Sequence, residues 1–330
     1  MTDGYFLIFA AVVGLCFGSF ANVVTNRLVK DQPVSWPPSY CFSCKTRLKW
    51  RDMVPIVSYV ALRAACRYCK GTISRRYPLV EGICAVLFVF MARHTGVTFA
   101  VLPLWGLAFV LLCVSVVDWD TMEIPDGLLV FGAVCGAAWV ALSYYCGLSY
   151  GGLSHGPGCG LSSYGLSYGP GYEPGCGLSY GSGYGPSHGP GYGTSHGLSC
   201  GPNYGPSSHG PSHGPGYAPS HGPNYGSSWW SSWRPALLGA AAGALPLFLV
   251  DRLVWMVAKK PGFGFGDVKL MAVCGLFLGV ARVPAAYFFA FVCGGAFAAM
   301  LLVSGRAKRG SYFAFGPFLC FGVLVAFFLC

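Results

Sequence analysis

Charge is scarce in this sequence. Of its 330 residues only 10% are Asp, Glu, Lys or Arg, whereas a soluble globular domain has roughly 25% charged residues. Hydrophobic residues make up 54% of the chain. This composition excludes an ordinary soluble domain and indicates a polytopic membrane protein. The net charge of +10 does not indicate a nucleic-acid partner, because the Lys and Arg residues cluster between apolar runs.

Two catalytic signatures are also absent. The sequence contains neither the HExxH pattern of zinc peptidases nor a Walker phosphate-binding loop. Chemistry must then come from the few polar residues that interrupt the apolar runs. An ionisable residue at membrane depth is costly, so each one there is a candidate functional residue.

The apolar runs predict an all-α polytopic membrane protein with about eight transmembrane helices. A span needs about 20 apolar residues, so the sixth run is short. The predicted spans are 5–24, 78–94, 99–117, 127–146, 235–257, 268–281, 283–304 and 313–330. They divide the chain into a first helix (1–24), a polar loop (25–77), helices two to four (78–146), a low-complexity segment (147–228) and helices five to eight (229–330).

The positions of the charged residues predict the topology. The first apolar run has Asp3 before it and Arg27 and Lys30 after it, the reverse of a cleaved signal peptide. We therefore expect an uncleaved anchor with its N-terminus outside. Alternation then places on the cytoplasmic side the segments that hold most of the Lys and Arg residues. These segments are 25–77, 118–126, 258–267 and 305–312.

Four cysteines in the polar loop have the spacing of a metal site. Cys41 and Cys44 form one CxxC pair, and Cys66 and Cys69 form a second. Four thiolates from two such turns can close a tetrahedron around Zn²⁺, and the metal would replace a core that the loop is too small to build. All four positions would be ligands, so a zinc ion here would be structural. Free thiols or two disulfides remain the alternatives, the latter disfavoured in the cytoplasm.

The segment 147–228 is built from variations on GLSYG, SHGPGYG and GPNYG. It has one charged residue, Glu173, and six of the seven histidines. Such a composition cannot bury enough apolar surface to offset chain entropy, so it predicts a disordered loop. Weak binding of a transition metal by the histidines is a less favoured reading than a repeat with no ligand.

Two aspartates stand at the junctions of apolar and polar segments. Asp118 closes an apolar run in VVDWDTMEIPD, and Asp267 opens one in GFGFGDVKL. Gly264 and Gly266 permit close backbone approach. Two carboxyl groups in contact cannot both ionise, so one can act as general base on a water while the other polarises a peptide carbonyl. The residues alone leave open a pair of helix caps or a path for ions or protons, and they support peptidase and transporter equally.

Six stretches resemble, in order, those of the type 4 prepilin peptidases, aspartic membrane peptidases of the GxGD type. Members of that family process type 4 prepilins and type II secretion pseudopilins. The stretches are GLCFGSFANVVTNRL, the two CxxC pairs, ISRRYPLVE, VVDWDTMEIPDGL, GFGFGDVKLMAVCG and FGPFL. The resemblance covers 1–146 and 229–330, and the segment between them departs from the family pattern.

By this resemblance Asp118 and Asp267 match the two catalytic aspartates. Asp120 and Asp126 match other motif positions, and Asp120 is the residue most easily mistaken for the catalytic one. Lys269 either balances the charge of the pair or lies at the head-group boundary. Gly264 and Gly266 are the glycines of the GxGD motif and support its conformation.

The resemblance implies cleavage of a basic leader at the cytoplasmic face of the bacterial inner membrane. It also implies N-methylation of the new N-terminus with S-adenosylmethionine in many members, although the chain has no GxGxxG fingerprint. Implied partners are the prepilin or pseudopilin substrates, the pilus or type II secretion assembly machinery and membrane lipid, with no nucleic acid. Glu81 could pair with Arg76 or serve in helix packing. Further motif positions are matched by Gly18, Ser19, Asn22, Arg27 and Glu81.

Two other classes of protein compete with this interpretation. One is a carboxylate-dependent ion or proton transporter with a zinc-binding cytoplasmic module, which would be expected to show an internal repeat of the two halves. The halves do not match. The other is an inactive scaffold of a pilus or secretion machine, in which the Asp motifs would be expected to erode.

Overall fold

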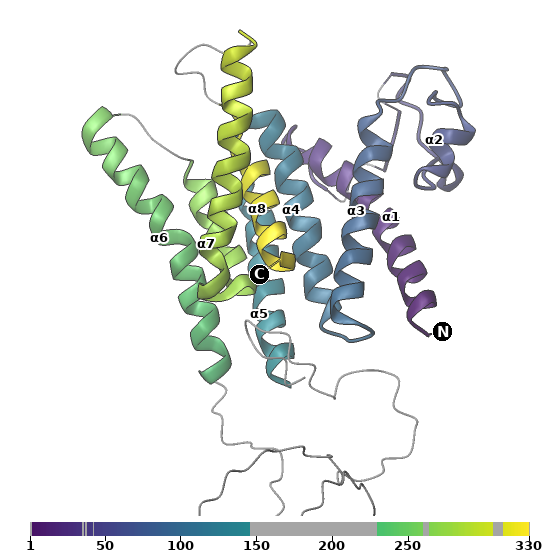
Figure 1. Ribbon diagram of the computed structural model, residues 1–330. Helices are drawn as coiled ribbons and strands as arrows, with labels where there is room; N and C mark the ends of the chain where they lie inside the picture. The colour runs from purple at the N-terminus through teal and green to yellow at the C-terminus, as the bar shows by residue number, and fades with distance from the viewer. Residues whose placement is uncertain are drawn as a thin grey trace, which may run out of the picture. The chain divides into compact units, whose positions relative to one another are not determined.

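The structure is a computed structural model, and all the residues it describes lie in one compact unit formed by Met1–Ser163 and Ser227–Cys330. The described residues are 2–34, 36, 38–41, 43–145, 230–259, 264–305 and 313–329. The low-complexity segment 147–228 and its six histidines lie outside them, so its predicted disorder stays a prediction. Strand pairing in the described part is limited to two isolated bridges. The prediction of an all-α fold is therefore confirmed (Figure 1).

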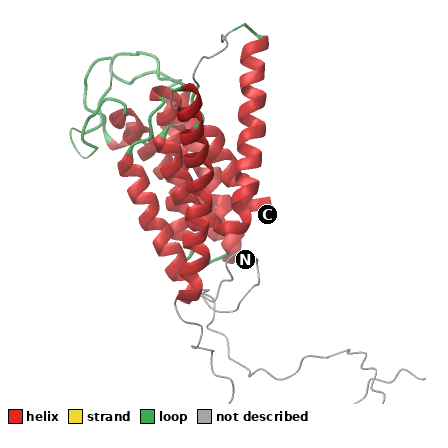
Figure 2. Cartoon of the chain, turned by 90° about the vertical axis from the view of Figure 1, so that its left-hand side faces the viewer, coloured by secondary structure: helices red, strands yellow, loops and turns green. Residues whose placement is uncertain are grey.

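The apolar runs of the chain form helices. In order, the helices are α1 (Thr2–Leu28), the 3-10 helix η1 (Trp50–Asp52), α2 (Val57–Ala61), α3 (Arg76–Thr95), α4 (Val101–Thr121), α5 (Asp126–Tyr145), α6 (Trp230–Ala258), α7 (Phe265–Val303) and α8 (Gly316–Leu329). Among them, six are long and apolar enough to cross a membrane, namely α1, α3, α4, α5, α6 and α7. The long helices lie side by side, and the loops gather at their ends (Figure 2). The chain is thus a multi-pass membrane protein.

The helix α7 contains two of the predicted spans as two antiparallel arms. Its 39 residues are interrupted at Gly279, whose φ of 68° and ψ of 171° are not helical. Gly243 of α6 lies against the backbone of Met271 in the first arm and accepts a hydrogen bond from the Tyr287 hydroxyl in the second. Both arms therefore contact α6, as in a hairpin. With α8, which has 14 residues, this arrangement is consistent with eight spans, a number that remains a prediction.

The helix α4 is the centre of the bundle. In its candidate span 83% of the residues are buried, against 17% in the span of α6. Leu104, Leu107 and Leu111 recur along one side of α4 and are almost completely buried, so α4 contributes a continuous apolar stripe to the core. A residue at the end of α4 is consequently held by a rigid element.

Two helix pairs approach so closely that only glycine fits between them. In the α1–α3 pair, a Cβ on Gly14 would lie 2.7 Å from the Cα of Ala85, and a Cβ on Gly18 would lie 2.6 Å from the Cα of Glu81. In the α6–α7 pair, Gly239 and Gly275 face each other, and a Cβ on either would overlap the backbone of the other helix. Small residues of this kind let membrane helices pack by backbone contact.

Candidate active site and metal centre

Asp118 lies in the last turn of α4, at the edge of the apolar core. The helix ends at Thr121, and the next residue, Met122, adopts a left-handed conformation and donates its N–H to the carbonyl oxygen of Asp118 at 2.8 Å. The side chain of Asp118 is only 5% exposed, and its Oδ2 accepts the backbone N–H of Gly316 at 2.9 Å. The first residue of α8 therefore fixes the orientation of this carboxyl group.

Asp267 lies in the first turn of α7 and is 8% exposed. Its N–H donates to the carbonyl oxygen of Gly264 at 3.0 Å, and Gly264 is the extended residue that begins the helix. A Cβ on Gly266 would lie 2.9 Å from the Cβ of Ile124, in the loop after α4. The two glycines of the GxGD motif thus start the helix and admit the neighbouring loop.

The structure places Asp118 and Asp267 in one site, and their catalytic role stays a prediction. They come from helices that are distant in sequence, yet their carboxyl groups are near enough for the charge of one to act on the other. Both are buried, and Gly316 of α8 completes the cluster. Sequence reasoning assigned no role to Gly316, although the FGPFL stretch that contains it carried part of the resemblance.

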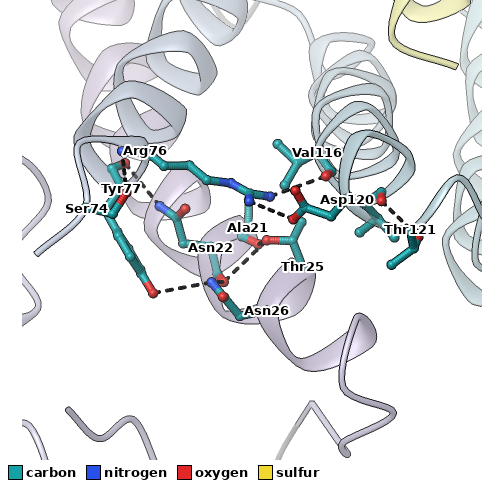
Figure 3. Close-up of polar contacts among 11 residues, drawn as sticks. Ala21, Asn22, Thr25, Asn26, Ser74, Arg76, Tyr77, Val116, Asp120 and Thr121 are labelled. Atoms are coloured by element: carbon teal, nitrogen blue, oxygen red, sulfur yellow. Dashed lines mark hydrogen bonds and ion pairs between the residues drawn. The ribbon is translucent and has the colours of Figure 1, made fainter. Parts of the chain in front are cut away.

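The other acidic residues of the motifs have separate partners. Asp120 is paired with Arg76 at 2.6 Å (Figure 3), and Asp126 is paired with Lys269 at 2.7 Å. Lys269 therefore neutralises Asp126 and joins α7 to α5, rather than balancing the Asp118–Asp267 pair.

The suggested pairing of Arg76 with Glu81 is wrong. Arg76 points from α3 to the end of α4, where it also donates to the carbonyl oxygen of Val116 at 3.3 Å. Glu81 instead accepts the backbone N–H of Ile56 at 2.7 Å. The exposed carboxylate of Asp120, in the last turn of α4, pairs with the guanidinium of Arg76, and Glu81 remains buried.

The four predicted metal ligands form one cluster. The Sγ atoms of Cys41, Cys44, Cys66 and Cys69 all lie within 4.8 Å of one another, and those of Cys41 and Cys69 are 3.9 Å apart. A tetrahedral zinc site with Zn–S bonds of about 2.3 Å has S–S edges of about 3.8 Å. The thiols are free of disulfides, so the cluster can hold a metal ion.

The two CxxC turns are copies of one structure, offset by 25 residues along the chain. The bridge between Tyr40 and Arg47 recurs between Ala65 and Thr72. The residue after each pair, Lys45 or Lys70, has a left-handed φ of 58° or 59°. Each turn directs two thiols to the same point, and the paired copies build the four-sulfur cluster.

Local hydrogen bonds favour the thiolate at Cys44 and Cys66. The pKa of Cys69 is instead raised to about 11, because the backbone hydrogen bond with Gly71, which lowers it, is outweighed by burial and by hydrogen bonds with the neighbouring thiols. The hydroxyl and backbone N–H of Thr46 lower the pKa of Cys44 to about 6. Backbone N–H groups of Cys69 and Tyr68 lower the pKa of Cys66. Thiolate is the form that binds a metal, so the donor set fits a closed, structural ion.

Comparison with known proteins identifies the families and relatives that this chain resembles. A family model described as the bacterial peptidase A24 N-terminal domain matches residues 12–95, and one described as the type IV leader peptidase family matches residues 221–299. A curated protein of Pseudomonas putida named prepilin leader peptidase/N-methyltransferase is 26% identical over 348 residues, which cover 99% of this chain and 91% of the relative. The chain belongs to the type IV leader peptidase family.

Other members of the family with the same name align over most of the chain. The protein of Myxococcus xanthus is 27% identical over 303 residues, covering 92% of this chain and 65% of the relative. That of Bacillus subtilis is 23% identical over 316 residues, covering 96% of this chain and 91% of the relative. No solved structure matches the chain. Of the two aspartates, Asp267 falls within the second family-model match and Asp118 falls between the two matches.

Proposed function

We propose that this chain is an aspartic endopeptidase of the membrane that removes the leader of prepilins or pseudopilins, with Asp118 and Asp267 as its catalytic residues. The observation that carries the proposal is the burial of both carboxyl groups, one in the last turn of α4 and one in the first turn of α7, near enough for the charge of one to act on the other. The names of the relatives supply the substrate class.

The proposed chemistry needs one ionised and one protonated carboxyl group. The ionised member takes a proton from a water molecule, which then attacks the scissile carbonyl carbon, and the protonated member polarises the carbonyl oxygen. Gly316 donates its N–H to Asp118, which holds that carboxyl group in place. The proton is shared, so its titration belongs to the pair.

The position of the pair suits a substrate with an apolar helix. Asp118 ends α4 and Asp267 begins α7, so a peptide bond just before a membrane-embedded helix would meet them at the membrane surface. We assign this surface to the cytoplasmic side of the bacterial inner membrane, because the basic polar loop lies at the same end. We also propose that this loop contacts lipid head groups. The enzyme would work together with the pilus or type II secretion machinery.

Two groups from outside the chain complete the proposed enzyme. Cys41, Cys44, Cys66 and Cys69 would hold a structural Zn²⁺, for the reasons of geometry and thiolate chemistry given above. S-adenosylmethionine, when bound, supplies a methyl group on a positively charged sulfur. That group would go to the amine of the new N-terminus, in the N-methylation that the relatives' names include.

Leader cleavage of a co-expressed prepilin, followed by gel shift, tests the proposal. We expect Asp118→Asn and Asp267→Asn each to lower cleavage at least about 100-fold, the usual loss on removing a general acid or base. Asp120→Asn, the matched control, should lower cleavage by less than about tenfold, because it breaks only a partly exposed ion pair. Equal monodisperse yield and equal unfolding temperature of the bundle in all variants would show that they are folded. Cleavage that survives both active-site changes would refute the peptidase mechanism and revive the transporter.

A further inference from the structure

Arg282 is a cation to which the described residues supply no acidic partner. It follows the break at Gly279 in α7 by three residues. None of the three ion pairs among the described residues includes it. Its Nε is the only buried side-chain nitrogen or oxygen in the described part of the chain that makes no hydrogen bond. An ionisable residue inside a membrane bundle is costly, so Arg282 is a candidate functional residue.

The side chains around Arg282 are aromatic rings. Its guanidinium carbon lies 6.0 Å from the centre of the Phe327 ring in α8. His94, in the last turn of α3, has its ring centre 5.3 Å from that of Phe327 and 5.7 Å from that of Phe328. Arg282 is near enough to His94 for its charge to act on that ring. We call these four residues the arginine cluster. Aromatic faces attract a cation but carry no net charge, so the positive charge of the cluster is not neutralised.

The acidic side chains that the structure describes lie elsewhere. They are in the polar loop, in the second turn of α3, around the carboxyl pair and near the end of α6. Gly239 and Gly243 of α6 face Gly275 and Met271 of α7, so α6 runs antiparallel to the first arm of α7 and its end lies on the side of Asp267. The arginine cluster lies at the opposite end of that arm. An anion that neutralises the cluster would therefore have to come from outside these residues.

The lengths of two elements bring membrane lipid to this cluster. The helix α8 has 14 residues, and the first arm of α7 runs from Phe265 only to Gly279. At 1.5 Å per residue, α8 spans about 21 Å, whereas the hydrocarbon core of a bilayer is about 30 Å thick. A bilayer thins beside a short apolar span. The head groups of that leaflet are thereby drawn toward Arg282, at the end of the first arm.

Apolar side chains beside the arginine cluster suit an acyl chain. Ile83, Val86 and Phe90 follow one another at helical spacing on α3, and all three are exposed. The ring centre of Phe90 lies 4.5 Å from that of Phe328, so this apolar stripe reaches the cluster. An inorganic anion would gain nothing from the stripe, whereas a phospholipid has both a phosphate and an acyl chain. The surroundings therefore favour a phospholipid.

From these observations we infer that the arginine cluster binds the phosphate group of an anionic phospholipid, whose acyl chain lies along α3. A guanidinium can donate two parallel N–H bonds to a phosphate. The lipid would belong to the leaflet on the side away from the carboxyl pair, so this site is distinct from the contact of the polar loop with head groups. It would also hold the end of α8, whose first residue, Gly316, orients Asp118. No step of leader cleavage enters this binding, so it stands or falls independently of the proposed function.

Photocrosslinking tests this site, with phosphatidylglycerol that carries a diazirine in its acyl chain, added at one molecule per full-length protein in detergent. We expect crosslinks within 83–95 or 316–329. Unlabelled phosphatidylglycerol should compete for these crosslinks at least about tenfold more strongly than phosphatidylcholine, the effect of one charged contact. Arg282→Gln should lower the crosslinks at least about tenfold. The matched control Arg234→Gln changes an exposed arginine near the start of α6 and should leave them unchanged.

Three results would overturn the site, namely crosslinks that survive Arg282→Gln, crosslinks confined to other helices, and equal competition by phosphatidylcholine. Inorganic phosphate that competes as strongly as phosphatidylglycerol would indicate a free anion and refute the lipid. If Arg282→Gln is not monodisperse, Arg282→Lys takes its place, because it keeps the charge but lacks the planar pair of donors. We expect at least about threefold fewer crosslinks in Arg282→Lys, the effect of losing part of a charged hydrogen bond. Unchanged crosslinking would remove Arg282 from the site.

Discussion

The polar loop and the helix bundle are held together by different means. In the described part of 29–77, Cys66 is the only residue buried as a whole, and order depends on the four-cysteine cluster and on Asp52, which accepts hydrogen bonds from Arg67 and Tyr68. The bundle instead has a continuous apolar core and glycine-mediated helix contacts. The fold of the loop depends on a metal ion, and the fold of the bundle depends on close packing of its helices. Each region should therefore unfold under a treatment that leaves the other folded.

Metal removal should give the largest effect and should act on the loop alone. A structural zinc ion contributes about 10–16 kcal/mol to the folding of a small domain. We expect a chelator, or Cys66→Ser, to make 38–76 sensitive to protease while the thermal unfolding of the bundle changes little. Zinc analysis and limited proteolysis measure this, with Cys293→Ser as control. If the bundle unfolds together with the loop, the two regions are not independent.

A larger residue at the α6–α7 contact should damage the bundle alone. Gly275 meets the backbone of Gly239, whereas a Cβ on Gly295, in the same helix, would meet nothing within 4 Å. Overpacking costs about 1–3 kcal/mol and often more when backbone must move. We expect Gly275→Leu to lower the unfolding temperature and the monodisperse yield, with zinc content unchanged in the protein that remains. Similar behaviour of Gly295→Leu would contradict the close contact.

A methyl group on Gly316 should disturb the carboxyl pair without unfolding either region. Its Cβ would lie 2.7 Å from Oδ2 of Asp118, so that side chain must move. We expect Gly316→Ala to slow leader cleavage about tenfold, because small displacements of reacting groups are costly. Gly127→Ala is the control, since a Cβ there meets nothing within 4 Å. Normal cleavage by Gly316→Ala would remove Gly316 from the site.

The smallest effect should follow from breaking the Lys269–Asp126 ion pair. The two side chains are 39% and 70% exposed, and such pairs contribute about 0–1 kcal/mol. Cleavage by Lys269→Gln should therefore stay within about threefold of the wild type, and Asp126→Asn should match it. A loss as large as that of Asp118→Asn would show that Lys269 acts on the catalytic pair after all.

The residues of the metal cluster and of the carboxyl pair could be predicted from short sequence motifs. The CxxC spacing and the two Asp junctions are local patterns, and both sets of residues come together in the structure. Contacts between distant segments were not predictable, because no local pattern encodes them. The bond from Gly316 to Asp118 spans 198 residues, and the choice of Asp120 over Glu81 by Arg76 depends on where α4 ends.

The ends of the helices could be predicted only from the apolar composition of each run, so the predicted ends are approximate. The predicted span 235–257 lies inside α6, Trp230–Ala258, because polar residues at the ends extend a helix beyond its apolar part. The predicted break between 281 and 283 falls close to Gly279, where the backbone leaves the helix. Apolar periodicity cannot locate such a turn, since the residues on both sides are equally apolar.

The two residues of the carboxyl pair come from the two parts of the chain on either side of the low-complexity segment. The bond from Gly316 to Asp118, the ion pair of Lys269 with Asp126 and the contact of Gly266 with Ile124 all join residues before 147 to residues after 228. The enzyme therefore resembles a heterodimer whose subunits share one polypeptide. Co-expression of 1–146 and 229–330 as separate fragments should restore leader cleavage, whereas inactive fragments that still associate would show that the pair requires a continuous chain.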